Sequence, residues 1–261
     1  MVDFHNHVIP GVDDGATDDR QAAAALQVFA EHGFDTIVAT PHVSGSLTLR
    51  DDALGERLAE IDVGWRRIEA IASEQFPSLR VLRGAEVMLD TPNLVLEDER
   101  LRLAGGRFAL VEFPYMTVPP QSHVVLQTLV RAGITPIIAH PERYVGMAPN
   151  SGLPVEWRRA GALLQINAGS VTGRYGPHAR ETALGLLERG LADYLCSDFH
   201  ARGRPSTRHA LELLAELGAE DQGELLVGVN PRRLLEGDQP VPVPALPRQT
   251  GLMQRLRQWL K

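Results

Sequence analysis

The chain has 261 residues, one cysteine and a formal net charge of −7. Its length fits a single α/β domain, and a lone cysteine excludes an internal disulfide framework and is typical of a reducing compartment. The acidic charge argues against nucleic acid as a partner, because phosphate backbones are bound by clustered Lys and Arg. The sequence predicts no membrane span and no signal peptide, so we expect a cytoplasmic protein.

Seven apolar, strand-like runs follow one another along the chain, and each ends in a polar side chain. They cover residues 1–4, 36–40, 80–84, 108–111, 136–139, 163–166 and 194–196. Helical patterns lie at 18–32, 54–74, 122–132, 155–160, 178–189 and 206–217, and a short helix is expected after Asn230. Alternating strands and helices predict a parallel sheet covered by helices. Because polar ends from all seven strands would have to meet, a distorted barrel is favoured over an open sheet.

The C-terminal part of the chain has a different composition. Four prolines between Asp238 and Thr250 predict an extended linker. We therefore expect a catalytic barrel over residues 1–237, a proline-rich linker over 238–250 and a short amphipathic helix over 251–261. That helix would dock on its own domain or on a neighbouring subunit, which leaves an oligomer open; docking on a membrane surface is less favoured.

The polar residues that follow the strands are of metal-binding types. His5 and His7 are two residues apart and therefore lie on the same side of a strand, and Asp198 and His200 repeat this spacing. In a barrel, the carboxyl ends of the strands share one face, so these side chains are expected to converge. The remaining strand endings are His42, Glu86, Glu112, His140 and Asn167.

Two further carboxylates, Asp13 and Asp14, follow a Pro10-Gly11 turn that can bring one of them over the first strand end. The other is expected to serve the turn or to cap a helix. Imidazole and oxygen ligands without thiolates suit Mn²⁺, Fe or Zn²⁺. Adjacent ions would serve phosphoester hydrolysis, because they polarise the phosphoryl oxygens and stabilise the leaving oxygen.

Taken together, the short motifs around these residues have a recognisable order. They are His5-Asn6-His7, Pro10-Gly11-Val12-Asp13-Asp14-Gly15, Gly84-Ala85-Glu86, Val111-Glu112-Phe113-Pro114, Ala139-His140-Pro141-Glu142-Arg143-Tyr144 and Ser197-Asp198-Phe199-His200. Each is weak alone, but their order resembles the polymerase-and-histidinol-phosphatase (PHP) superfamily, and more closely its bacterial capsule-type protein-tyrosine phosphatases. The resemblance runs from residue 1 to about 237.

This resemblance implies a distorted (β/α)7 barrel of the PHP type that holds two or three divalent ions, with Mn²⁺ favoured over Fe or Zn²⁺. The ligands of the first ion would be His5, His7, Glu86 and Asp198. Glu86 would be shared with a second ion that also takes Glu112 and His140. The ligands of the third ion would be Asp14, His42 and His200.

The resemblance also implies an activity and a partner. The expected reaction is metal-dependent hydrolysis of phosphotyrosine on a protein, with a membrane-associated bacterial tyrosine autokinase that controls capsular or exopolysaccharide synthesis as the substrate. Arg143 and Arg204 would bind the phosphate, since a guanidinium fork suits phosphate oxygens, and Arg202 could replace Arg204. His42, His140 or His200 could assist the leaving phenolate.

Three other interpretations stay open on sequence grounds. One is a small-molecule phosphatase of the histidinol-phosphate type, and another is a metal-binding scaffold without catalysis. The third follows from Cys196 and Arg202, which fit the C-x5-R signature of thiolate-dependent tyrosine phosphatases. We expect this match to be coincidental, because Asp198 within the loop would repel phosphate and Cys196 ends an apolar strand, where a thiol is commonly buried and inert.

Overall fold

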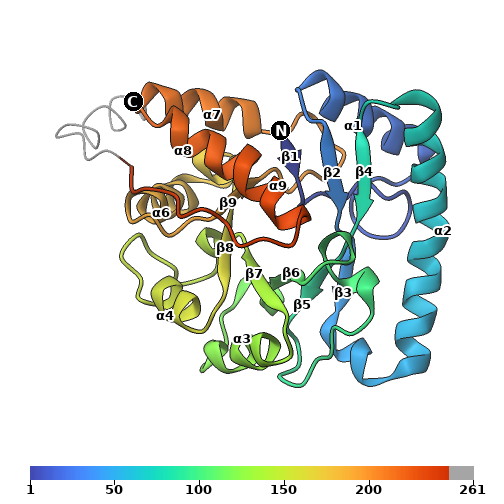
Figure 1. The fold of residues 1–261 in the computed structure, drawn as a ribbon, viewed down its shortest axis with the longest axis horizontal. Coiled ribbons are helices and arrows are strands. Elements are labelled where there is room, and N and C mark those ends of the chain that lie inside the picture. The colour runs from blue at the N-terminus through green and yellow to red at the C-terminus, as the bar shows by residue number, and fades with distance from the viewer. Residues whose placement is uncertain (247–261) are drawn as a thin grey trace.

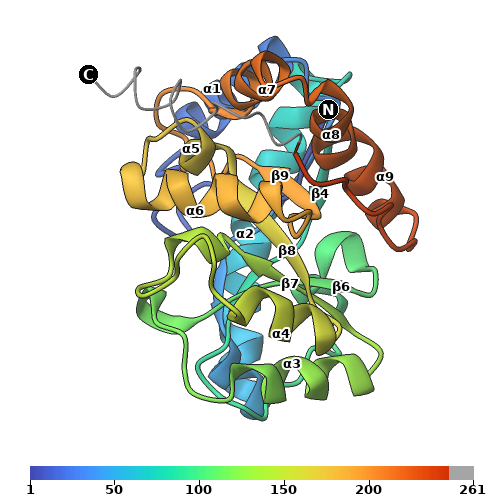
Figure 2. The same ribbon diagram turned by 90° about the vertical axis from the view of Figure 1, so that its left-hand side faces the viewer.

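The computed structural model describes residues 1–246, in which parallel strands are surrounded by helices (Figures 1 and 2). One sheet has the order β1-β2-β4 and the other the order β3-β5-β6-β7-β8-β9, and every pairing is parallel. The strands are β1 (Val2–Asp3), β2 (Thr36–Ala39), β3 (His42–Ser44), β4 (Arg80–Arg83), β5 (Glu86–Met88), β6 (Phe108–Glu112), β7 (Thr135–Ala139), β8 (Leu163–Asn167) and β9 (Tyr194–Cys196).

Seven of these strands, β1, β2, β4, β6, β7, β8 and β9, occupy the predicted positions. The short strands β3 and β5 were not predicted, and they begin at His42 and Glu86, just beyond two of the predicted runs. β2 and β3 are separated by Thr40 and Pro41, and β4 and β5 by Gly84 and Ala85. Proline has no amide hydrogen to donate to the sheet, which accounts for the first interruption. Hydrogen bonds continue across both gaps, since the Gly84 amide donates to the carbonyl of Ala39 over 2.9 Å and the Glu86 amide donates to the carbonyl of Pro41 over 3.1 Å.

Hydrogen bonds join the segments that follow the first and last strands. The Asp198 amide donates to the His5 carbonyl, and the His7 amide donates to the Phe199 carbonyl, each over 2.9 Å. Asn6 and Phe199 form an isolated parallel bridge at the same place. The predicted α/β fold of parallel strands and surrounding helices is confirmed, and these contacts lie at the carboxyl ends of the first and last strands, where the candidate ligands are.

All six predicted long helices are present, with ends that differ from the expected ones by at most three residues. Asp18 caps the first of them by accepting from the Gln21 amide. In Figure 1, α2 runs along one flank of the strands, while α3, α4 and α6 lie toward the other. The helices are α1 (Asp19–Glu31), α2 (Asp51–Gln75), α3 (Ser122–Arg131), α4 (Leu153–Arg159), α5 (Ala168–Val171), α6 (Pro177–Glu188), α7 (Thr207–Glu216), α8 (Glu220–Glu224) and α9 (Asn230–Leu235).

An apolar cluster lies among the strands. Phe4 and Tyr194 meet edge to face with ring centroids 5.0 Å apart, and Phe108, Leu110 and Ile137 belong to the same fully buried cluster. These side chains have no exposed surface. The polar strand ends therefore lie on a dry apolar base, which strengthens the electrostatic interactions among them.

The chain after α9 packs on the barrel as far as the structure describes it. Residues 238–246 contain no helix or strand. Val243 and Leu246 are nevertheless buried, and the Leu246 amide donates to the carbonyl of Leu187 over 3.1 Å. The helix predicted over 251–261 lies outside the described residues. No helix within residues 1–246 is long and apolar enough to cross a membrane.

Candidate metal centre

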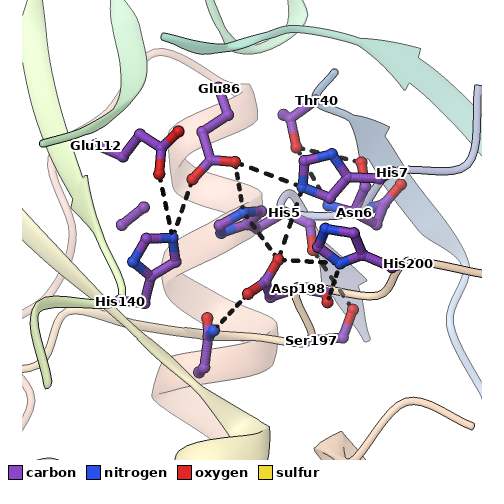
Figure 3. Close-up of polar contacts among 12 residues, drawn as sticks. His5, Asn6, His7, Thr40, Glu86, Glu112, His140, Ser197, Asp198 and His200 are labelled. Atoms are coloured by element: carbon purple, nitrogen blue, oxygen red, sulfur yellow. Dashed lines mark hydrogen bonds and ion pairs between the residues drawn. The ribbon is translucent and has the colours of Figure 1, made fainter. Parts of the chain in front are cut away.

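The nine predicted ligands come together at the carboxyl ends of the strands. Figure 3 shows His5, His7, Glu86, Glu112, His140, Asp198 and His200 gathered around one place. His42 and Asp14 adjoin the same cluster, since their Nε2 and Oδ1 atoms lie 3.5 Å apart and His200 Nε2 lies 3.3 Å from the same Asp14 oxygen. Residues separated by almost 200 positions in the chain thus share one site, as the barrel prediction requires.

Glu86 lies at the centre of this cluster. Its Oε2 atom is 3.2 Å from Nε2 of His5, 3.4 Å from Nε2 of His7 and 3.2 Å from Nδ1 of His42. Its other oxygen, Oε1, is 3.1 Å from Nε2 of His140. One buried carboxylate therefore faces four imidazoles from three places in the barrel, after β1, at the start of β3 and after β7, an arrangement suited to a ligand shared between ions.

The cluster contains polar atoms that lack the hydrogen bonds expected of buried groups. Among residues 1–246, Nε2 of His5, Nε2 of His7 and Oε2 of Glu86 are fully buried without a hydrogen-bond partner. Buried polar atoms are rarely left unpaired, because their desolvation costs about 1–3 kcal/mol each. Oε2 of Glu86 lies within 3.4 Å of both imidazole nitrogens, so this set of ligand atoms fits a cation held between them.

The electrostatics agree with a site that gathers positive charge. Burial lowers the pKa of His5, but Glu86 and Asp198 outweigh it and raise this pKa to about 9. Burial raises the pKa of Glu86, but His5 and His140 outweigh it and hold it well below its usual range. Protons on the imidazoles balance the carboxylates here, and a divalent cation can replace protons in that role.

The side chains that could bind an ion fall into overlapping groups, whose ligand atoms lie within 4.8 Å of one another. Three of the four ligands expected for the first ion form one group, and those expected for the third ion form another together with His7. Glu86 and Glu112 are grouped with His42, whereas His140 is grouped with His5 and Asp198. The division of ligands among ions stays a prediction.

A second layer of polar side chains orients the imidazoles. Asp13 Oδ2 lies 2.8 Å from Nδ1 of His7, and Gln165 Oε1 lies 2.8 Å from Nδ1 of His5. Asn167 donates to Asp198 over 2.7 Å. Such partners fix the tautomer of a ligating histidine and aim its other nitrogen. Sequence analysis left the roles of Asp13 and Asn167 open and missed Gln165, which is hidden inside an apolar strand.

Local backbone conformations also serve the site. Gly15 lies so close to the backbone of His7 that a Cβ atom there would be 2.0 Å from the His7 carbonyl oxygen, so only glycine allows this loop to fold over the strand end. His140 and Asp198 have φ angles of 35° and 51°. A left-handed backbone is costly for residues other than glycine and is often retained where function requires it.

The two predicted phosphate-binding arginines are placed differently. Arg143 Nη1 donates to Asp198 Oδ2 over 2.8 Å, and its guanidinium lies over the ring of Tyr175, 4.2 Å from the centroid. Arg204 is exposed and makes no hydrogen bond or ion pair within residues 1–246. Its neighbour Arg202 instead donates to the carbonyl of Asp14 over 2.8 Å. The geometry thus brings Arg143 and Arg202 to the cluster.

Cys196 lies on β9 among the apolar side chains of the strand cluster and has no exposed surface. Burial raises the pKa of its thiol well above the usual range. A reactive cysteine needs a lowered pKa and access to substrate, and Cys196 has neither. The structure therefore supports our expectation that the C-x5-R match is coincidental.

Tyr144 supports the site in a way that sequence analysis did not assign. Its hydroxyl donates to the carbonyl of Ala139 over 3.0 Å and accepts from the amide of Phe113 over 3.1 Å. These two residues are the chain neighbours of His140 and Glu112. One buried hydroxyl thus ties together the ends of β6 and β7 that carry two candidate ligands.

Replacing Tyr144 with phenylalanine is expected to lower the free energy of unfolding by about 1–3 kcal/mol, because a buried amide loses its acceptor. The hydrolysis of phosphotyrosine expected from the sequence should also slow, since the segments that carry Glu112 and His140 lose their common support. Denaturant titration and kcat/KM would measure the two effects. Tyr115→Phe is the matched control, as Tyr115 is 93% exposed. Unchanged stability and activity in Tyr144→Phe would contradict this role.

Known proteins are similar to this chain in sequence. Tyrosine-protein phosphatase YwqE of Bacillus subtilis is 30% identical over 86% of this chain and 87% of its own length. Tyrosine-protein phosphatase CpsB of Streptococcus pneumoniae is 31% identical over 90% of this chain and 98% of its own length.

Solved structures agree with this likeness. One from a study of YwqE and CpsB, described as metal-dependent tyrosine phosphatases, matches with a TM-score of 0.75 and 28% identity over 95% of this chain and 100% of that one. A phosphotriesterase from Mycobacterium tuberculosis, at 16% identity and a TM-score of 0.54, covers 92% of this chain and 95% of its own and shares the fold alone. The family model for capsular polysaccharide synthesis, CpsB/CapC, matches residues 1–236. With this match over nearly the whole barrel, the chain belongs to the CpsB/CapC family.

Proposed function

We propose that this chain is a metal-dependent protein-tyrosine phosphatase. The observation that carries the proposal is the buried cluster around Glu86, whose unpaired imidazole and carboxylate atoms face one another. Relatives of nearly the same length, about 30% identical, are named tyrosine-protein phosphatases. The alternatives of a histidinol-phosphate-type enzyme and of a scaffold have no such support among these relatives.

The proposed metal ligands are the nine residues predicted from the sequence, and two or three divalent ions would be held. We propose Mn²⁺, with Fe or Zn²⁺ as alternatives, because imidazole and carboxylate donors accept all three. When bound, the ions would polarise the phosphate and activate water for attack on phosphorus. The ligands are His5, His7, Asp14, His42, Glu86, Glu112, His140, Asp198 and His200.

Around these ligands, other side chains would bind and orient the substrate. Arg143 would hold the phosphate, since its guanidinium is partly exposed while one nitrogen is fixed on Asp198. Arg204 stays a second proposed phosphate contact, although Arg202 lies closer to the cluster. His42, 39% exposed, faces the solvent side and could aid the departing phenolate. Phenolate leaves readily, so strong acid catalysis is not required.

The substrate is proposed to be a protein rather than a small molecule. The side chain of Asp14 is 64% exposed and that of His42 39% exposed, so the outer edge of the cluster is accessible from solvent. A phosphotyrosine on an extended chain segment can reach such a site. Within its family, the proposed partner is a membrane-associated bacterial tyrosine kinase of capsular or exopolysaccharide synthesis, and the proposed compartment is the cytoplasm.

Metal removal and a cysteine variant test the mechanism together. We expect elemental analysis to find two or three metal ions per chain and a chelator to abolish hydrolysis of a phosphotyrosyl peptide, with Mn²⁺ restoring it. Cys196→Ser should retain activity within about twofold, because the buried thiol takes no part. Metal-free activity that disappears with Cys196 would refute the proposal in favour of a thiolate enzyme.

The same assay addresses the two alternatives. A higher kcat/KM for histidinol phosphate than for the phosphotyrosyl peptide would favour the small-molecule phosphatase. A fully metal-loaded protein without turnover of any phosphomonoester would favour the scaffold.

A further inference from the structure

A cavity of about 600 Å³ adjoins the outer edge of the metal centre. Some of its lining residues are candidate metal ligands, and others are apolar side chains from three separate segments of the chain. The ligands are Asp14, His42 and Glu112, the apolar residues are Val12, Val43, Leu47 and Met88, and Asp13, Ser44 and Arg57 complete the lining. A single cavity thus joins a site suited to phosphate with a wall suited to a hydrocarbon group.

The strand register explains why this wall lies next to the ligands. Glu86 pairs with His42 across β5 and β3, and two residues further along, Met88 pairs with Ser44 and with Glu112 of β6. Side chains two residues apart lie on the same side of a strand, so Met88 projects on the same side as Glu86. Two residues of strand advance the chain by roughly 7 Å toward the mouth of the barrel.

Arg57 of α2 holds the two segments that form this wall. Its Nη2 atom donates to the carbonyl of Val12 over 2.8 Å and to that of His42 over 2.9 Å, and Nη1 lies 3.1 Å from Glu60. Both carbonyls belong to segments that carry candidate ligands. The guanidinium of Arg57 is therefore occupied by these contacts. Through them, helix α2 fixes the positions of two of the segments that line the cavity.

We propose that this cavity is an aryl subsite, which binds the phenyl ring of the substrate phosphotyrosine against Val12, Leu47 and Met88. The inference rests on the proposed function and adds the group that the enzyme would recognise. In phosphotyrosine, the phenyl ring is bonded to the oxygen that leaves the phosphorus. The ring must therefore lie beside the metal ligands that hold the phosphate, and the cavity lies there. A phosphorylated serine has no ring to fill the wall, and a methionine thioether adapts well to an aromatic surface.

Two phosphonates that differ only in a ring test the subsite. In calorimetric titrations of the metal-loaded full chain, benzylphosphonate should bind at least about tenfold more tightly than methylphosphonate, because its ring is removed from water. Met88→Gln and Leu47→Asn keep nearly the same size but make the wall polar. Each should reduce the ratio to about threefold or less while the dissociation constant of methylphosphonate stays unchanged.

The outcomes separate this inference from the proposed function. Val124→Asn is the control, since Val124 is 45% exposed on α3 and does not line the cavity, and it should keep the tenfold ratio. Equal binding of both phosphonates by the unaltered protein would overturn the subsite. Equal weakening of both by Met88→Gln and Leu47→Asn would overturn it too, as it would indicate damage to the metal centre. A metal-loaded protein that prefers benzylphosphonate yet fails to hydrolyse phosphotyrosyl peptides would refute only the proposed phosphatase function.

Discussion

The variant Glu86→Gln is expected to lose at least about a thousandfold in kcat/KM toward a phosphotyrosyl peptide. Glutamine keeps the size of the side chain but removes its charge and one of its two acceptor oxygens. The effect should be large because Oε2 of Glu86 lies within 3.4 Å of nitrogens of His5, His7 and His42, and Oε1 lies 3.1 Å from His140. Ligands of every proposed ion are therefore affected by one substitution.

Metal content is the measurement that gives this result its meaning. Elemental analysis should show the loss of at least one ion per chain in Glu86→Gln, together with the loss of activity. Glu69→Gln removes an exposed carboxylate from α2 and should change neither quantity. If Glu86→Gln bound the full number of ions and turned over normally, Glu86 would not be a ligand and the proposed centre would be wrong.

The sequence was most informative about strand ends, because two physical rules act there together. Buried strands are apolar, so the first polar residue after each run marks the end of a strand, and parallel strands in a barrel end on one face. His140 and Glu112 could be placed in this way without any knowledge of their distance. The predicted helices were equally accessible, since apolar spacing and caps such as Asp18 are local signals.

Features that depend on contacts between distant segments could not be predicted. Nothing near Tyr144 in the sequence indicates that its hydroxyl joins the ends of β6 and β7, or that Gln165 of β8 faces His5. The short helix α5 and the π-helical turn Leu225–Val229 were missed for a similar reason, as each is too short to show a periodic pattern. Pro41, which follows β2, is visible in the sequence as a residue that ends a strand. The start of β3 at His42 could not be predicted, because it depends on pairing with β5.

Replacing Arg143 is expected to have the second-largest effect. Arg143→Ala should lower kcat/KM by about a hundredfold to a thousandfold, the usual cost of removing one donor to the charge that develops in a transition state. Its guanidinium is 25% exposed, whereas the carboxylate of Asp198 that it contacts is 3% exposed. One nitrogen of the group is therefore bound to Asp198, while part of the side chain stays accessible to a phosphate.

Arg143→Lys separates charge from shape. A lysine keeps the positive charge near Asp198 but lacks the planar fork and cannot lie flat over Tyr175, so we expect it to recover only part of the lost activity, leaving about a tenfold defect. Metal content should be unchanged in both variants, because Asp198 retains its hydrogen bond from Asn167. Arg131→Ala, which removes an exposed arginine from α3, is the control. Full activity in Arg143→Ala would show that Arg143 does not bind phosphate. An equal loss of metal and activity would show that Arg143 instead supports the ligand Asp198.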